Sequence, residues 1–135
     1  MNEATLEYVR QHADDDVRQL ALRGSKDEAV NMTAALQQIA GLQAARRKLP
    51  SWAAVEGVLF PPHLAMEQCS SEQTALYKSE NVTRYARTMF PQDKNEVLVD
   101  LTGGFGVDFS FMARSFKRAV YVERQEELCQ ETDRP

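Results

Sequence analysis

The sequence lacks the features of a membrane or secreted protein. No stretch approaches the ~18 uninterrupted apolar residues that a spanning helix needs. The first residues, Met-Asn-Glu-Ala-Thr, do not form a basic and apolar leader. The only two cysteines, Cys69 and Cys129, lie far apart and do not have the spacing of a metal site. We therefore expect a cytoplasmic protein with reduced thiols, no membrane partner and no bound metal.

The sequence also has no excess of positive charge. Its 16 Lys and Arg residues and 20 Asp and Glu residues give a net charge of −4. This balance argues against nucleic-acid binding over the whole surface. A local exception is Arg46-Arg47-Lys48, which either contacts RNA phosphates or stabilises the negative end of a helix. The length of 135 residues suits one domain or slightly more.

The first half of the chain has the apolar spacing of helices. Near the N-terminus, apolar residues recur every three or four positions, as on one face of an amphipathic helix. The acidic run Asp14 to Asp16 predicts an interruption and the cap of a second helix, and Gly24 predicts its end. The run Ser25 to Glu28 has the spacing of a capping box. It predicts a longer helix from about Lys26 to Lys48, which Pro50 ends.

A further helix is predicted after residue 70. Ser70-Ser71-Glu72-Gln73 is another capping signature, and the helix that it opens should end before Pro91. The turn at residues 92–95 then leads into a strand. His63, which follows two prolines, is more readily explained as a surface or capping residue than as a catalytic one, because no partner acid or nucleophile accompanies it.

The stretch VLVDLTGGFGVD, Val97 to Asp108, is the most informative part of the sequence. Its apolar, partly β-branched start suits a strand that is covered on both faces. Three glycines follow, which allow backbone angles and a close ligand approach that a Cβ would block. Apolar residues with helical spacing come next, and Ala119 to Val122 then has the composition of a second strand. The pattern predicts a β-α-β unit with a ligand-binding turn.

Two common nucleotide-binding loops do not fit this turn. The dinucleotide pattern G-x-G-x-x-G fails at its third glycine, where the chain has Phe109. The Gly-Lys-Ser/Thr of a phosphate-binding P-loop is missing. The acids that remain are Asp100, just before the turn, and Glu123, at the end of the second strand. An acid in the latter position can accept hydrogen bonds from ribose hydroxyls.

These residues carry a resemblance to a known family. VLVDLTGGFGVD followed by AVYVER resembles the first two motifs of class I S-adenosylmethionine-dependent methyltransferases. The pattern is similar to bacterial RNA methyltransferases, including the ribosomal RNA guanine-N2 type. In particular, it resembles a Bacteroidetes family of RNA methyltransferases that carry a THUMP-like domain near the C-terminus. The segment from Lys48 to Ser79 looks like the region of that family that precedes the cofactor loop.

The resemblance implies S-adenosyl-L-methionine as cofactor and RNA as substrate. The three glycines would let the backbone pass under the methionine part of the cofactor, and Asp100 would orient the loop. Asp108, in the first turn of a helix, would interact favourably with the helix dipole or would instead cap backbone amides, and Glu123 would bind the two ribose hydroxyls. The segment before the first strand would either line the pocket or act only as a packing helix. The implied cofactor-binding residues are Asp100, Thr102, Gly103, Gly104, Phe105, Gly106, Asp108 and Glu123, with Thr74, Tyr77 and Lys78 as further pocket candidates.

The sequence contains only part of what such an enzyme needs. It has signals for two strands, whereas the family has about seven, and it lacks the N/D-P-P-aromatic motif that holds the target amino group. We expect a mainly α N-terminal domain at 1–68, followed at 69–135 by the start of a Rossmann-like methyltransferase domain. We also expect the chain to be the inactive N-terminal part of a longer enzyme, with its catalytic residues beyond Pro135.

Two other functions stay open from the sequence. The chain could be a non-enzymatic helical interaction module, which forms homo-oligomers through the exposed edge of its incomplete sheet. A nucleotide binder of the dehydrogenase type is a weaker alternative, because Phe109 occupies the position of its third glycine.

Overall fold

The computed structural model describes residues 1–92, 97–126 and 128–129 of the chain. The chain divides into two compact units, Met1–Glu67 and Gln68–Pro135. Among the described residues, no helix is both long and apolar enough to cross a membrane. The terminal residues 131–135 and the turn predicted at 92–95, apart from Gln92, lie outside the described residues.

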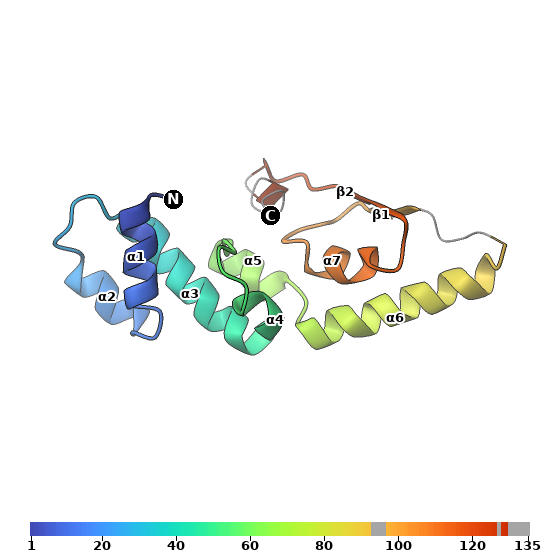
Figure 1. Cartoon of the computed structure of the whole chain (residues 1–135), viewed down its shortest axis with the longest axis horizontal. Coiled ribbons are helices and arrows are strands. Elements are labelled where there is room, and N and C mark those ends of the chain that lie inside the picture. The colour runs from blue at the N-terminus through green and yellow to red at the C-terminus, as the bar shows by residue number, and fades with distance from the viewer. Residues whose placement is uncertain (93–96, 127, 130–135) are drawn as a thin grey trace. The chain divides into compact units, whose positions relative to one another are not determined.

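All the regular secondary structure of unit 1 is helical (Figure 1). The last of its helices, α5, begins in unit 1 and ends at the first residue of unit 2. The helices are α1 (Glu3–Gln11), α2 (Val17–Arg23), α3 (Met32–Lys48), α4 (Pro50–Ala53) and α5 (His63–Gln68).

The break between α1 and α2 follows the sequence signals. The side chain of Asp16 caps α2 by accepting hydrogen bonds from the backbone N–H groups of Arg18 at 2.8 Å and Gln19 at 3.0 Å. Gly24 ends α2 with a φ of 68°, which is a left-handed angle that favours glycine. Both predicted boundaries are confirmed.

The predicted start of α3 is wrong. The helix begins at Met32 and not near Lys26, because the side chain of Asn31 caps it through the N–H of Ala34 at 3.1 Å. The Ser25 hydroxyl instead accepts from the N–H of Asp27 at 3.0 Å and forms a local turn. The predicted end is confirmed, since α3 stops at Lys48 and Pro50 begins α4.

The core of unit 1 forms where α3 meets the segment after α4. Ile39 and Leu49 are fully buried, and Phe60 is 4% exposed. Gly41 lies on α3 beside Phe60, and a Cβ on Gly41 would lie 2.3 Å from the Cβ of Phe60. The buried Gln38 donates to the carbonyl oxygen of Phe60 at 2.9 Å and accepts from its N–H at 2.9 Å. This exchange satisfies a buried amide next to the apolar contact.

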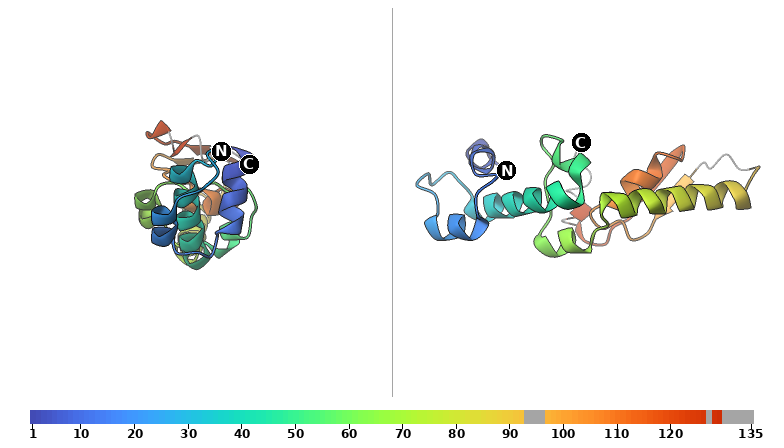
Figure 2. Two further views of the ribbon diagram at one scale, coloured as in Figure 1. Left: turned by 90° about the vertical axis from the view of Figure 1, so that its left-hand side faces the viewer. Right: turned by 90° about the horizontal axis from the view of Figure 1, so that it is seen from below.

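Unit 2 contains one long helix and a β-α-β segment. The helix α6 (Glu72–Met89) precedes strand β1 (Val97–Asp100), helix α7 (Val107–Ala113) and strand β2 (Arg118–Tyr121). The two strands are parallel and pair from Val97 with Arg118 to Asp100 with Tyr121. Figures 1 and 2 show α6 beside α7, and Figure 1 shows α7 between α6 and the strands. The predicted start and end of α6 are confirmed, with Ser71 as its cap.

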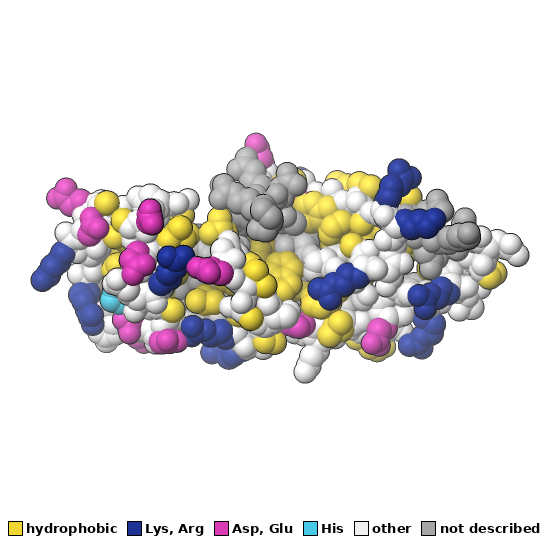
Figure 3. Space-filling model, in the orientation of Figure 1, with side chains coloured by type: hydrophobic (Ala, Val, Ile, Leu, Met, Phe, Trp, Pro, Cys, Tyr) yellow, Lys and Arg dark blue, Asp and Glu magenta, His cyan; other side chains and the backbone are white. Residues whose placement is uncertain are grey.

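The strands are covered on one face only, which corrects the expectation of cover on both faces. The rings of Phe109 on α7 and Tyr121 on β2 meet edge to face, with centroids 5.5 Å apart. The opposite face carries exposed apolar side chains, and Figure 3 shows hydrophobic side chains gathered over β1 and β2. The exposed residues are Val97, Val99 and Leu101 along the first strand and Val120 and Val122 along the second.

The observed fold is mostly helical with a small two-stranded parallel sheet. This agrees with the mainly α character predicted for the N-terminal part and with the predicted β-α-β order of the second part. The assignment of residues 1–68 to a helical domain and of 69–135 to a cofactor domain stays a prediction.

Candidate functional site

The candidate site lies where β1 ends. The carboxylate of Asp100 accepts from the N–H of Thr102 at 2.9 Å, which turns the chain away from the strand. The backbone of Val122 donates to the carbonyl of Asp100 at 2.9 Å, and the N–H of Gly103 donates to the carbonyl of Val122 at 2.9 Å. These bonds extend the strand pairing into the turn, so the segments after both strands lie side by side.

Different structural constraints require glycine at the three positions of the turn. Gly104 and Gly106 have φ angles of 56° and 82°, which side chains rarely tolerate. Gly103 is required by packing, since a Cβ there would lie 2.0 Å from Cε2 of Tyr121. The phenol of Tyr121 also donates a hydrogen bond to the carbonyl of Gly104. The Tyr121 side chain therefore restrains the turn through its packing on Gly103 and its hydrogen bond to Gly104.

Glu123 joins the turn from the second strand. Its Oε2 accepts from the N–H of Gly104 at 2.7 Å, and its Oε1 accepts from the N–H of Gln125 at 2.7 Å. The hydrogen bond from Gln125, followed by that from Gly104, lowers the pKa of Glu123 below its ordinary value of 4.5. The structure thus brings this acid and the glycine turn together, as the sequence predicts for a shared crevice. The carboxylate is ionised at neutral pH and keeps lone pairs for further donors.

Buried apolar residues lie in the turn and on the helix that follows it. Phe105 is 5% exposed, and Val107 and Phe111 on α7 are 2% and 4% exposed. Phe105 is therefore a packing residue of the turn in this structure, while Thr102 and Leu101 are exposed. Because the Phe105 side chain is buried, its packing restrains the loop between Gly104 and Gly106.

Asp108 is held by Ser70, which precedes α6, and by Lys78 on α6. Its Oδ2 lies 2.7 Å from Nζ of Lys78 and accepts from the hydroxyl of Ser70 at 3.0 Å. Lys78 also donates to the Ser70 hydroxyl at 2.8 Å. The other oxygen, Oδ1, is buried and has no hydrogen-bond partner among the described residues. Asp108 does not cap α7 with its side chain, so this alternative from the sequence is not seen.

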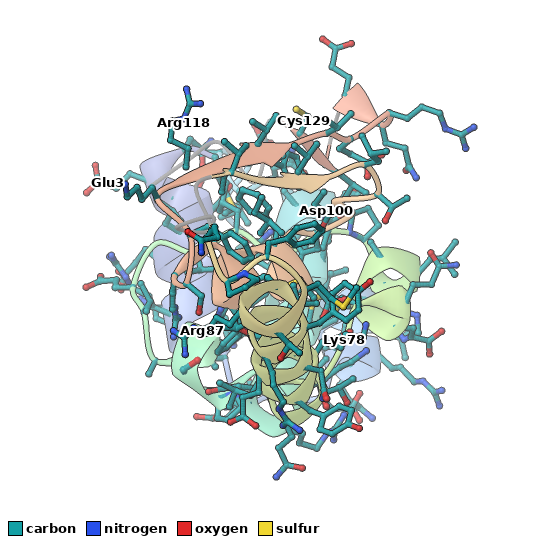
Figure 4. The ribbon with its side chains drawn as sticks, turned by 90° about the vertical axis from the view of Figure 1, so that its right-hand side faces the viewer. Glu3, Lys78, Arg87, Asp100, Arg118 and Cys129 are labelled. Carbon is teal, nitrogen blue, oxygen red and sulfur yellow. The ribbon has the colours of Figure 1, made fainter. Side chains whose placement is uncertain are left out.

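The three candidates on α6 have different environments. Of the three, only Lys78 has a recorded contact with another predicted site residue, Asp108 at the start of α7. The Thr74 hydroxyl pairs with that of the capping residue Ser71 at 2.9 Å, and Tyr77 is 68% exposed. Figure 4 looks along α6 and labels Lys78 and Asp100, which lie on the same side of the helix axis.

Sequence reasoning gave no role in the site to Ser70 and Tyr121. Ser70 belongs to the capping signature, and the structure uses its neighbour Ser71 for the cap and Ser70 for Asp108. Tyr121 is one of four strand residues, and nothing in its spacing indicates a bond to Gly104. Both contacts join segments well separated in sequence, and local patterns do not report such contacts.

The arrangement suits the binding of a nucleoside with an attached polar group. In parallel α/β units, ligands bind outside the carboxyl ends of the strands, next to a glycine turn and an acid on the following strand. Asp100, the glycines and Glu123 all lie at that end. The carboxylate of Glu123 can accept from vicinal hydroxyls, and the turn leaves little side-chain bulk in the way.

The chain is similar to a putative methyltransferase from Porphyromonas gingivalis W83, whose crystal structure it matches with a TM-score of 0.72 and 26% sequence identity. The match covers 95% of this chain and 29% of that chain, so this chain spans less than a third of the length of that protein. No family model matches the chain, and no curated protein matches it. The similarity over nearly the whole chain supports a methyltransferase relationship.

Proposed function

We propose that the chain provides the cofactor-binding part of an S-adenosyl-L-methionine-dependent methyltransferase. Its second unit would be the first β-α-β segment of a Rossmann-like class I domain. The bound cofactor would supply a methyl group already activated on a sulfonium. The contribution of this chain is then to hold the cofactor in place and in the right orientation.

The residues of the turn fit this group. Glu123 is ionised and presents acceptor oxygens beside Gly104, as the ribose hydroxyls require. A Cβ on Gly104 would meet nothing closer than 3.9 Å, so the backbone is open on that side. The buried Oδ1 of Asp108, at the start of α7 just after the turn, is an acceptor without a partner among the described residues. A cationic amino group is the kind of donor that would satisfy such an atom.

The substrate class rests on the sequence resemblance. We propose RNA as the substrate and a base nitrogen, such as guanine N2, as the acceptor, in a cytoplasmic enzyme. The chain spans 29% of the matched methyltransferase and has no N/D-P-P-aromatic motif. We therefore propose that it does not transfer methyl groups by itself and that the catalytic residues belong to other parts of a longer protein.

The observation that carries the cofactor proposal is the hydrogen bond of 2.7 Å between Gly104 and Glu123. It joins the glycine turn of one strand to the acid of the next. Calorimetry with S-adenosylhomocysteine should detect binding to the chain, and Glu123→Ala should weaken it by roughly 1–3 kcal/mol, the usual cost of an unpaired polar group. The carboxylate also accepts from the N–H of Gly104, so a loss reports on its contacts with both the ligand and the turn.

Glu80→Ala is the matched control, since it removes an exposed acid of the same type from α6. This control should bind S-adenosylhomocysteine as the wild-type protein does. Equal affinity of Glu123→Ala and the wild type would remove Glu123 from the site. Absence of binding by the wild-type chain would contradict the cofactor proposal as a whole.

The bare face of the sheet favours a second candidate function. Five exposed apolar side chains on a two-stranded sheet form a surface that soluble monomers rarely leave uncovered. Both strands also offer edges for further pairing. In this alternative the chain is a non-enzymatic module that dimerises with a second copy through the sheet.

Light scattering coupled to size-exclusion chromatography distinguishes this alternative. A dimer of the wild-type chain that Val99→Lys converts to a monomer would support it, because Val99 is 52% exposed on the bare face. Leu22→Lys is the control, since Leu22 is 86% exposed on α2 in unit 1. A wild-type monomer at all accessible concentrations would rule out the module.

A further inference from the structure

A polar cleft lies along α6 in unit 2. Its volume is about 520 Å³, and sites for small molecules commonly enclose about 300–1,000 Å³. The helix α6 forms most of the wall, and Ser115, from the loop between α7 and β2, closes the other side. Arg87 of this cleft and Lys78 are roughly two and a half turns apart on α6, so they lie on opposite sides of the helix, as Figure 4 shows. The cleft is therefore separate from the contact between Lys78 and Asp108.

Two arginines of the cleft are free to bind a ligand. Arg84 and Arg87 are exposed, and neither side chain makes an ion pair or a hydrogen bond with any residue that the structure describes. They lie three residues apart on α6 and are therefore neighbours on its surface. Each guanidinium presents a planar fork of donors that binds two oxygens of an anion at once.

Four hydroxyl side chains line the same cleft, and the fold uses two of them. Ser79 donates to a backbone carbonyl of α7 at 3.0 Å, and Thr88 donates to the preceding turn of α6 at 2.9 Å. The hydroxyls of Thr83 and Ser115 make no hydrogen bond with the part of the chain that the structure describes. These two hydroxyls come from opposite walls of the cleft and are open to a ligand.

Thr83 carries the more informative of the two free hydroxyls. The residue is 9% exposed, and a polar group this deeply placed normally has a partner. Among the described residues, Oδ1 of Asp108 is the only fully buried side-chain oxygen or nitrogen without one, so the Thr83 oxygen is still reached by solvent. Thr83 also lies four residues before Arg87, on the same side of the helix. An unused hydroxyl beside an unpaired guanidinium provides two donors for one anion.

These donors suit a phosphate group better than a carboxylate. A phosphate monoester carries a charge of about −1.5 to −2 at neutral pH and has three strong acceptor oxygens, whereas a carboxylate has a single charge and two oxygens. Two guanidiniums balance the charge of the phosphate. The hydroxyls of Thr83 and Ser115 add donors from both walls.

An acid in the lining constrains the rest of the ligand. Glu80 is exposed and lies nearer the start of α6 than both arginines. Its carboxylate repels a phosphate but accepts hydrogen bonds from hydroxyl groups. The cleft is therefore cationic toward the end of α6 and anionic toward its start. A molecule with a phosphate at one end and hydroxyls at the other matches both.

We infer that this cleft binds a small hydroxylated phosphate monoester of the sugar phosphate class. Arg84, Arg87, Thr83 and Ser115 hold the phosphate, and Glu80 accepts from the hydroxyls of the sugar. This site is additional to the glycine turn, and the inference does not depend on whether the turn holds a cofactor.

The Arg46-Arg47-Lys48 cluster in unit 1 lacks these features. Arg46 pairs with Asp14, and Lys48 donates to the carbonyl oxygens of Met66 and Glu67 at 2.7 Å each. Two of its three cations therefore have structural partners. This outcome favours the structural interpretation of that cluster over phosphate binding.

The test is calorimetry of ribose 5-phosphate with the 135-residue protein in phosphate-free buffer. Arg87 is the arginine to change, because no acid lies three or four residues from it on α6, whereas Glu80 can pair with Arg84. Arg87→Gln should weaken binding at least about tenfold, since it removes hydrogen bonds between charged groups. Thr83→Val keeps the shape of the side chain and removes its hydroxyl, so it should weaken binding about fivefold.

Matched variants separate these losses from general effects. Arg118→Gln makes the same change of charge on an exposed residue of unit 2 outside the lining of the cleft. Thr88→Val removes a hydroxyl that α6 already uses. Both should bind ribose 5-phosphate within about twofold of the wild type, because neither removes a free donor of the cleft.

Two further ligands test the role of Glu80. Ribose should not bind, because it lacks the phosphate. Inorganic phosphate should bind more weakly than ribose 5-phosphate, since it has no sugar hydroxyls for the carboxylate. Glu80→Gln should bind inorganic phosphate more tightly than the wild type does and should lose the preference for the sugar phosphate.

Several results would overturn the inference. They are no binding of ribose 5-phosphate by the wild type, equal losses in Arg87→Gln and Arg118→Gln, or inorganic phosphate binding as tightly as ribose 5-phosphate. A loss in Glu123→Ala would also overturn it, because the sugar would then lie at the glycine turn. Calorimetry with S-adenosylhomocysteine tests the cofactor proposal independently, and Arg87→Gln should keep that binding unchanged.

Discussion

Replacement of Lys78 by methionine should destabilise unit 2. The change removes the ammonium that lies 2.7 Å from Oδ2 of Asp108 and 2.8 Å from the hydroxyl of Ser70. Hydrogen bonds to charged groups contribute about 1.5–3 kcal/mol, while exposed pairs contribute about 0–1 kcal/mol. The Lys78 side chain is 43% exposed and that of Asp108 is 29% exposed, so the pair lies between these cases. We expect a loss of about 1–2 kcal/mol in the free energy of unfolding.

Urea denaturation followed by circular dichroism measures this loss. Lys26→Met is the control, because Lys26 is exposed in the loop before α3 and should tolerate the change. A double-mutant cycle with Asp108→Asn isolates the pair, since the cost of Lys78→Met should shrink when no carboxylate is present. If Lys78→Met costs the same in both backgrounds, the ion pair does not hold α6 against α7.

Three further changes test the fold and the site. Gly103→Ala should lower the melting temperature in a thermal scan, because the new Cβ would lie 2.0 Å from the Tyr121 ring. Gly41→Ala should also destabilise the protein in urea, since contact with Phe60 at 2.3 Å outweighs the ~1 kcal/mol by which alanine favours a helix. For Glu123, whose folded pKa is lowered, the stabilising contribution is present above the unfolded value of 4.5 and lost as pH falls through the folded pKa. The stability difference between wild type and Glu123→Gln should therefore be constant near neutral pH and shrink in acid.

Local signals predicted much of the secondary structure. Caps and breakers act within a few residues, so Asp16, Gly24 and Ser71 mark helix ends that the structure reproduces. The start of α3 was mispredicted because two capping signals compete within one loop. Ser25 begins a turn that its own hydroxyl stabilises, and Asn31 caps the helix.

The contacts that shape the site could not be predicted in the same way. The meeting of Glu123 with Gly104 was expected because parallel strands bring their carboxyl ends together. The bond from Ser70 and Lys78 to Asp108 depends instead on how α6 packs on α7, which apolar spacing alone does not specify. Likewise, a conformational reason explains Gly104 and Gly106, while Gly103 is needed for its neighbour Tyr121.

Net charge does not describe how the charges of unit 2 are distributed. The acids of the turn, Asp100 and Glu123, lie at the carboxyl ends of the strands, whereas Arg118 begins β2 at the amino end. The two ends are about 13 Å apart, and salt screens charges over about 8 Å at physiological ionic strength. Each end therefore presents its own field to a ligand. A chain with a net charge of −4 can in this way carry acids at one end of its strands and an arginine at the other.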